Sequence, residues 1–427
     1  MKRPATKITR LANGLRVVCV EAPHLKSAYV GLVIGIGSRH EQAKDNGLSH
    51  FLEHMVFRGT RKYEDARDLN AAAESIGGAL DAATYRDHTH YGTVAHPSRV
   101  DLALELLSEI VLYPKLQHIE TERTIIMEEM RESFGARGQL VDVDTLAHQQ
   151  HYKGHALGQP IEGTVENVER FTRRDLKRHF AACYTAPASV LVLAGNVRLA
   201  EVLPRVKRRF LRMSDRAPAT TKAPNHAAKK PRLHWVNDPG AQVDLRLCFS
   251  GLAAADRDAP ALNMLSRVLG EGLSSRLHSD LIDKKALAYS LSAGPEMFAD
   301  CGTYDFDVAV APEKLLVTVR ELLAFANDAI AKPPTKKELT LAKERYAIGL
   351  DFMADAPADL ALWTARNLQQ DLDVDIDRAA ERFFAVTSDD CRRVAARIFD
   401  RRTLLACGVG AISKTLRRGL ERAVLLS

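Results

Sequence analysis

The fold of this chain is decided by one stretch, Gly47-Leu48-Ser49-His50-Phe51-Leu52-Glu53-His54-Met55-Val56-Phe57-Arg58-Gly59-Thr60. Its apolar spacing predicts a helix near Leu48–Phe57 that ends at Gly59. Residues four apart lie one turn apart on the same face of a helix, so His50 and His54 can direct two imidazoles at one ion. Glu53 lies beside them on that face.

Two histidines and a glutamate at this spacing are typical of a catalytic zinc site. Zinc with three protein ligands keeps a fourth position for water and lowers the pKa of that water, and a nearby carboxylate can take the proton. The helix supplies two ligands and Glu53 as the base, so the third ligand must come from elsewhere. The best source is the helix predicted around residues 122–129. Glu122 and Glu129 lie two turns apart on one face of it, whereas Glu128 is rotated away, and spacing alone leaves both Glu122 and Glu129 as candidates.

The composition is that of an ordinary globular protein. The chain has 427 residues, 46% hydrophobic and 27% charged, and this length favours two or more domains. It contains no apolar run long enough for a bilayer, so we expect no membrane span. The net charge of +6 is modest and its basic residues are spread along the chain, which argues against nucleic acid as a partner. We expect a cytoplasmic location, because no secretory signal is visible and the six cysteines are scattered.

A polar stretch divides the chain nearly in half. Residues 213–231 are rich in serine, threonine, proline and lysine and show no apolar periodicity, which is typical of a linker. We therefore expect an N-terminal half at 1–212, which carries the zinc motif, and a C-terminal half at 232–427. The second half lacks the motif and is expected to support substrate binding.

The two halves repeat the same order of elements. A strand-like Val243–Gly251 leads to a helical Ala259–Leu269, much as Tyr29–Ile36 leads to the helix that carries His50. Each half mixes antiparallel-type strands with long helices, which predicts an α+β fold produced by duplication. Because only the first half carries the motif, one zinc ion (Zn2+) per chain is expected.

The opening stretch resembles the signature of the pitrilysin/insulinase (M16) zinc peptidases, in particular the short-subunit branch that includes mitochondrial processing peptidase and its bacterial relatives. The resemblance extends over nearly the whole chain. It implies two homologous halves, each a largely antiparallel sheet packed with helices, that form a clamshell. The other matching segments are Glu74-Ser75-Ile76-Gly77-Gly78, Glu122-Arg123 with Glu129, Gly158-Gln159-Pro160-Ile161-Glu162-Gly163-Thr164, Ser275-Arg276-Leu277 and Leu287-Ala288-Tyr289-Ser290.

The resemblance also implies a role for each residue of the metal site. It makes His50, His54 and Glu129 the zinc ligands. It makes Glu53 the general base in the hydrolysis of a peptide bond. Glu122 becomes a supporting carboxylate that orients a ligand or tunes the metal.

For substrate binding, the resemblance implies that Leu80–Thr84 is an edge strand with which an extended peptide pairs. Asp81 and Thr84 would then contact the substrate, and Arg276 and Tyr289 would hold its backbone from the second half. The chain has Asp81 where asparagine is common in the family, so its substrate preference does not follow from the resemblance. The implied substrates are extended peptides or unfolded polypeptides.

Two alternatives accompany this interpretation. The first is a non-catalytic or partner-dependent subunit of the same fold; because this chain holds both the zinc motif and the arginine/tyrosine pair, we expect a homodimer rather than a heterodimer with a related subunit. The second is a rival metal site at His148, His151 and His155. The glycine at position 154 argues against a continuous helix there, so these histidines are expected to serve a loop.

Overall fold

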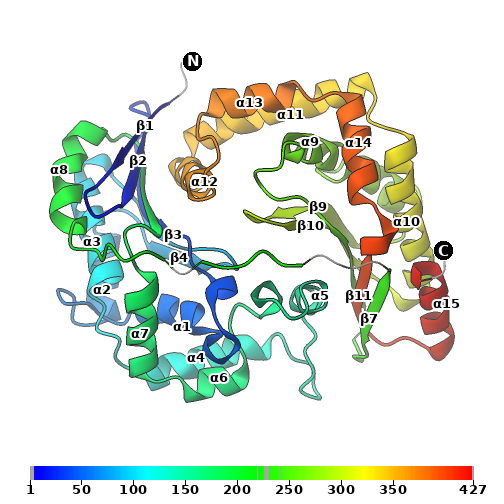
Figure 1. Cartoon of the computed structure of the whole chain (residues 1–427), viewed down its shortest axis with the longest axis horizontal. Helices are drawn as coiled ribbons and strands as arrows, with labels where there is room; N and C mark the ends of the chain where they lie inside the picture. The colour runs from blue at the N-terminus through cyan, green and yellow to red at the C-terminus, as the bar shows by residue number, and fades with distance from the viewer. Residues whose placement is uncertain (1–3, 219, 226–229, 241, 426–427) are drawn as a thin grey trace. The chain divides into compact units, whose positions relative to one another are not determined.

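The computed structural model describes residues 4–218, 220–225, 230–240 and 242–425, so residues 219 and 226–229 of the expected linker lie outside the described residues. The chain forms two compact units, and each is built from three segments (Figure 1). Unit 1 comprises Met1–Arg131, Gln159–Lys222 and Ile348–Ile376. Unit 2 comprises Glu132–Gly158, Ala223–Ala347 and Asp377–Ser427. Each unit thus contains one segment from the other half of the sequence.

Unit 1 is built on a six-stranded sheet in the order β1-β2-β6-β3-β5-β4. Only β2 and β6 are parallel; the other neighbours are antiparallel. Every residue of β3 and β6 is buried, because helices cover both faces of the sheet. The strands are β1 Ala5–Arg10, β2 Arg16–Glu21, β3 Ala28–Ile34, β4 Leu80–Thr84, β5 Thr89–Ala95 and β6 Ser189–Gly195.

The two faces of this sheet are covered by helices from distant parts of the chain. Figure 1 shows α3 on one side of the sheet and α12 on the other, where α12 packs on β3 and β6. The helices are α1 Leu48–Met55, α2 Ala66–Glu74, α3 Val100–Leu112, α4 Ile119–Arg131, α6 Val165–Arg170, α7 Arg173–Cys183, α8 Leu199–Phe210 and α12 Pro357–Gln369, with single turns η1 Ser38–His40, η2 Ala43–Asp45 and η3 Pro97–Arg99.

Unit 2 has a five-stranded sheet in the order β7-β11-β8-β10-β9, in which only β7 and β11 are parallel. Strand for strand, this order and these directions match β2-β6-β3-β5-β4 of unit 1. The α+β class is confirmed, and the shared order agrees with the expected duplication. The strands are β7 Arg232–Val236, β8 Val243–Ser250, β9 Ser290–Met297, β10 Gly302–Val310 and β11 Leu405–Val409.

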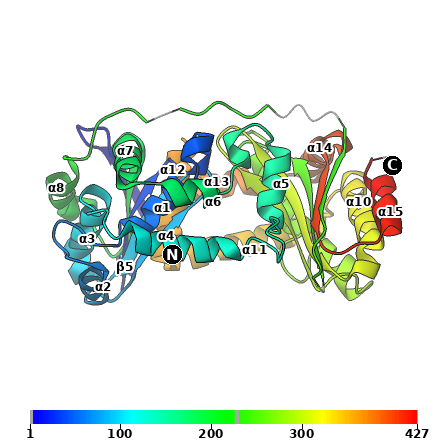
Figure 2. The same ribbon diagram turned by 90° about the horizontal axis from the view of Figure 1, so that it is seen from below.

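The helix layer of unit 2 repeats the arrangement of unit 1. Figure 2 shows α5 against one side of the sheet, where it packs on β8 and β11, and α10 and α15 on the other side. Because β8 and β11 are the counterparts of β3 and β6, α5 and α12 occupy equivalent places. The helices are α5 Val143–His151, α9 Ala259–Leu269, α10 Leu315–Ala331, α13 Ile376–Phe384, α14 Ser388–Ile398 and α15 Lys414–Leu425, with short turns η4 Ala156–Gly158, η5 His278–Asp283, η6 Pro312–Lys314 and η7 Arg401–Thr403. Helix α11, Lys336–Asp355, begins in unit 2 and continues into the segment of unit 1 that starts at Ile348.

Among the described residues, none of these helices combines the length and the apolar character that a bilayer span requires.

Candidate metal centre

Helix α1 is short and amphipathic. It buries Leu48, Phe51, Leu52 and Met55 in the core of unit 1, so its polar residues line the opposite face. The helix starts at Gly47, whose φ is +104°, and a Cβ there would lie 2.6 Å from the carbonyl oxygen of Glu162. Only glycine fits this start without strain, because other residues disfavour positive φ and the space is filled by backbone.

The two histidines of α1 meet a carboxylate from α4, which packs against α1. The Nε2 atom of His50 lies 3.7 Å from one oxygen of Glu129, and the Nε2 atom of His54 lies 3.5 Å from the other. The ligand atoms of these three residues all lie within 4.8 Å of one another. Two imidazole nitrogens and one carboxylate oxygen are a donor set that zinc binds in catalytic sites, so these residues fit the metal.

Glu122 contacts the other side of the same histidine. Its side chain is 2% exposed, and its Oε2 atom lies 3.1 Å from Nδ1 of His54. Its Oε1 atom accepts a hydrogen bond from Arg58. A carboxylate on Nδ1 favours the tautomer in which Nε2 is free to coordinate, so this position suits the supporting role that the resemblance implies for Glu122. The sequence interpretation missed Arg58, although it lies four residues after His54 in the opening stretch.

His50 is arranged differently from His54. It is buried, and its Nδ1 atom has no hydrogen-bond partner among the described residues. Burial, together with the neighbouring His54, lowers the pKa of His50 to about 3. The imidazole is therefore neutral at physiological pH, which is the form that coordinates a metal.

Glu53 is directed from α1 toward β4. Burial raises the pKa of Glu53 above its ordinary value, although the neighbouring Thr84 and His54 lower it. Thr84 itself is 9% exposed, so it lies against the base and not on the open surface of the strand. A half-buried carboxyl with a raised pKa is suited to accept and then return a proton.

Strand β4 is an edge of the sheet. Among the described strands it pairs with β5 alone, so its other side is open to an additional strand. The side chain of Asp81 is 66% exposed, and its carboxylate lies 3.2 Å from Nε2 of His90 on β5. The edge that was expected to receive substrate therefore borders the helix that carries Glu53, because α1 packs on β4.

Arg276 and Tyr289 belong to unit 2. Arg276 donates hydrogen bonds to both carboxylate oxygens of Glu338, at 2.6 and 2.7 Å, and to the carbonyl oxygens of Lys332 and Pro333. Its guanidinium is thus already bonded within the unit. Tyr289, by contrast, is 87% exposed. That these two residues bind substrate stays a prediction.

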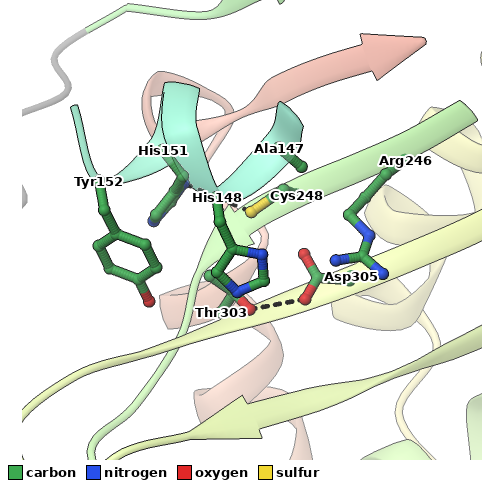
Figure 3. A pocket seen from close by; sticks show the side chains of 8 residues that line it. All are labelled: Ala147, His148, His151, Tyr152, Arg246, Cys248, Thr303 and Asp305. Carbon is green, nitrogen blue, oxygen red and sulfur yellow. Dashed lines mark hydrogen bonds between the residues drawn. The ribbon is translucent and has the colours of Figure 1, made fainter. Parts of the chain in front are cut away.

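The rival histidines do not form a comparable cluster. His148 and His151 lie in α5, which ends at His151, three residues before Gly154 with φ +83°. Figure 3 shows both beside Cys248 in a polar pocket of unit 2. His148 contacts Glu296 at 2.7 Å, while Nδ1 of His155 accepts a hydrogen bond from the backbone of residue 157. Within the described part of the chain, the group on α1 and α4 is the one set of three potential ligands that lie this close together.

Comparisons with known proteins agree with this geometry. The chain matches the family model described as Insulinase (Peptidase family M16) over residues 16–165, and the model described as Peptidase M16 inactive domain over residues 170–346. It is 31% identical to a protein described as probable mitochondrial-processing peptidase subunit beta from Arabidopsis thaliana, over 86% of this chain and 71% of that protein. It is 30% identical to an uncharacterized zinc protease of Mycobacterium leprae, over 97% of this chain and 94% of that protein.

Solved structures share the fold. A protease from Helicobacter pylori has a TM-score of 0.86 at 22% identity, over 96% of this chain and 100% of that chain. A structure described as a peptidase M16 inactive domain, from Pseudomonas fluorescens, has a TM-score of 0.87 at 18% identity, over 96% of this chain and 98% of that chain. At these identities the likeness concerns the fold alone. The sequence relatives and the family models together show that the chain belongs to the insulinase family of peptidases, M16.

Proposed function

We propose that this chain is a zinc-dependent endopeptidase that hydrolyses extended peptides or unfolded polypeptides. The observation that carries the proposal is the convergence of His50, His54 and Glu129 beside the half-buried carboxyl of Glu53. Relatives whose names describe them as zinc proteases support the choice of metal. One metal site per chain is expected, because α9, the counterpart of α1, contains neither histidine nor glutamate.

In this mechanism each residue has a separate task. Zinc held by His50, His54 and Glu129 would supply the Lewis acidity that lowers the pKa of water and polarises the scissile carbonyl. Glu53 accepts a proton from the attacking water and donates it to the departing amine, and its raised pKa favours holding that proton between the two steps. Glu122 keeps His54 in the coordinating tautomer.

The substrate would bind as an extra strand at β4. Backbone pairing at an edge is tolerant of sequence, which suits an enzyme for extended chains. The exposed Asp81 would contact substrate side chains, and Thr84 would lie between the substrate and Glu53. Tyr289 is exposed enough to bind substrate as expected, whereas Arg276 would first have to leave Glu338.

The decisive test is Glu53→Gln. Glutamine has the same shape but cannot take the proton, so we expect about one zinc per chain by metal analysis and at least a hundredfold loss of kcat on an unfolded peptide. Circular dichroism and the zinc content serve as controls for folding. Full activity of this variant would remove Glu53 from the mechanism.

A partner-dependent subunit is the second candidate, because one relative is named as a subunit of a processing peptidase. Peptide cleavage by the purified chain alone, stopped by a chelator and restored by zinc, would support the self-sufficient enzyme. Cleavage that requires a second protein would favour the subunit. The expected homodimer and cytoplasmic location stay predictions.

A further inference from the structure

Helix α1 has no side-chain cap of its own, although it carries two ligands and the base. It has eight residues and begins at Gly47, which offers no capping side chain. The first N–H groups of a helix have no partner within it, and so short a helix is marginal unless its ends are held. The position of His50 therefore depends on what satisfies these N–H groups.

Glu41, which follows η1, supplies the missing cap from a distance. Its Oε2 atom accepts a hydrogen bond from the backbone N–H of Gly47 at 2.8 Å, and its Oε1 atom accepts one from that of Ser49 at 2.6 Å. The side-chain amide of Asn46 donates to Oε2 at 3.1 Å. The Glu41 side chain is fully buried. Both of its oxygens are thus used on the turn that immediately precedes His50.

The same turn is also hydrogen-bonded by Pro160, which lies in the family motif Gly158–Thr164, and by Asn167 of α6. Asn46 donates to the carbonyl oxygen of Pro160 at 2.8 Å. Asn167 donates to the carbonyl oxygens of Ala43 and Asn46, at 2.8 and 3.0 Å. We call Glu41, Asn46 and Asn167 the α1 anchor. No residue of the anchor contacts the three ligands directly.

The two histidine ligands differ in what fixes them. His54 is oriented by Glu122 through its Nδ1 atom, whereas Nδ1 of His50 has no such partner among the described residues. The direction of the His50 ring is therefore set by packing and by the placement of its backbone. That backbone directly follows the N–H of Ser49, which Glu41 holds.

We propose that Glu41 is a positioning residue of the metal centre, which fixes His50 relative to Glu129 by capping α1. The inference rests on the proposed function, since it concerns the affinity of the same site for zinc. A buried carboxylate of unit 2 shows the contrast: Asp258 lies at the start of α9, but it pairs with Arg393 and Arg397 and positions no ligand.

The isosteric change Glu41→Gln isolates this role. Burial raises the pKa of Glu41 to about 7, even though the hydrogen bonds from Gly47, Ser49 and Asn46 lower it. At a pH below 7 the carboxyl is mostly protonated, so replacing it by a neutral amide alters the charge little there. Glutamine offers only one oxygen, so its NH2 group must face the N–H of either Gly47 or Ser49, and one of these bonds is lost.

The experiment compares zinc affinity, by competition with a chromophoric chelator, for wild type, Glu41→Gln and the matched control Asp258→Asn. Outer partners of a metal site typically contribute 10–100-fold to affinity, so we expect about a tenfold higher Kd for zinc in Glu41→Gln and a lower kcat at unchanged KM. Asp258→Asn should lower Tm but leave both the Kd and kcat at wild-type values.

Three outcomes are distinguishable. If wild type binds no zinc, the proposed function fails before Glu41 is tested. If Glu41→Gln lowers only Tm, as the control does, Glu41 is merely structural and the inference is overturned. Should this variant not fold, Asn167→Ala removes one amide of the same anchor; an unchanged zinc Kd in that variant would equally overturn the inference.

Discussion

Glu122 and Glu129 lie two turns apart on α4, yet they contact different nitrogen atoms. Glu129 faces the Nε2 atoms of both histidines, and Glu122 contacts Nδ1 of His54. The two carboxylates should therefore respond differently to the same chemical change. When a direct ligand loses its charge, the site loses most of its affinity for zinc. When a supporting carboxylate loses its charge, the affinity changes less.

We expect Glu129→Gln to retain no stoichiometric zinc after dialysis, because the amide replaces an anionic ligand. Glu122→Gln should still bind zinc, with a Kd about 10–100-fold higher. Metal analysis and chelator competition measure both. The matched control is Glu128→Gln on the same helix, whose exposed carboxylate pairs with Arg131 and should not affect zinc. Equal loss of zinc in Glu122→Gln and Glu129→Gln would contradict these assignments.

At this scale, local geometry predicted part of the site. The shared face of His50, Glu53 and His54 follows from helix periodicity, which needs no tertiary information. The choice between Glu122 and Glu129 did not follow, because they share a face and only the packing of α4 on α1 distinguishes them. Thr84 was expected on an edge strand, but its burial against Glu53 depends on the packing of α1 on β4.

At the scale of the element, the backbone at the start of α1 requires a glycine at position 47. Gly47 combines positive φ with a backbone contact that leaves no room for a Cβ, whereas Gly154 has positive φ with nothing within 4 Å of a Cβ. A substitution at position 154 therefore tests the cost of positive φ alone, and one at position 47 tests that cost together with a steric clash. Both glycines lie outside the ligand set.

We expect Gly154→Ala to cost about 1 kcal/mol, from positive φ alone. Gly47→Ala adds a clash with the carbonyl oxygen of Glu162, so we expect it to cost roughly 2–4 kcal/mol and also to weaken zinc binding. Urea unfolding of both variants, with zinc titration, checks the comparison. Equal costs for the two variants would show that the backbone between η2 and α1 relaxes freely.

Strand and helix patterns predicted several elements well. The helix expected at Ala259–Leu269 matches α9 residue for residue, and the strand expected at Val243–Gly251 differs from β8 by one residue, because alternation and a 3.6-residue period are strong local signals. The packing of α5 on β8 and β11 left no local signal, since it depends on contacts distant in sequence.

At the scale of the whole molecule, the two units interleave along the chain. Unit 1 receives α12 from the second half of the sequence, and unit 2 receives α5 from the first. The echo of strand and helix patterns predicted the duplication. The division of the chain at residues 213–231 was predicted from composition. Composition carries no information on which helix packs on which sheet, so it could not predict that the units exchange α5 and α12.

A cut between Lys222 and Ala223 tests the consequence. Fragment 1–222 lacks α12, so apolar faces of β3 and β6 that are buried in the intact chain become exposed. We expect it to aggregate when expressed alone and to form a soluble 1:1 complex when co-expressed with 223–427. Solubility and size-exclusion chromatography measure this, with the uncut chain as control. A soluble, cooperatively unfolding 1–222 would contradict the expectation.

The late position of α12 also matters for how the protein is made. The metal-site residues precede unit 2's segment Ala223–Ala347 in the chain, whereas the last segment of unit 1, Ile348–Ile376, follows it. During synthesis the polypeptide emerges in this order, so residues 223–347 of unit 2 leave the ribosome before α12 can cover β3 and β6, and the core of unit 1 closes only after much of unit 2 has emerged.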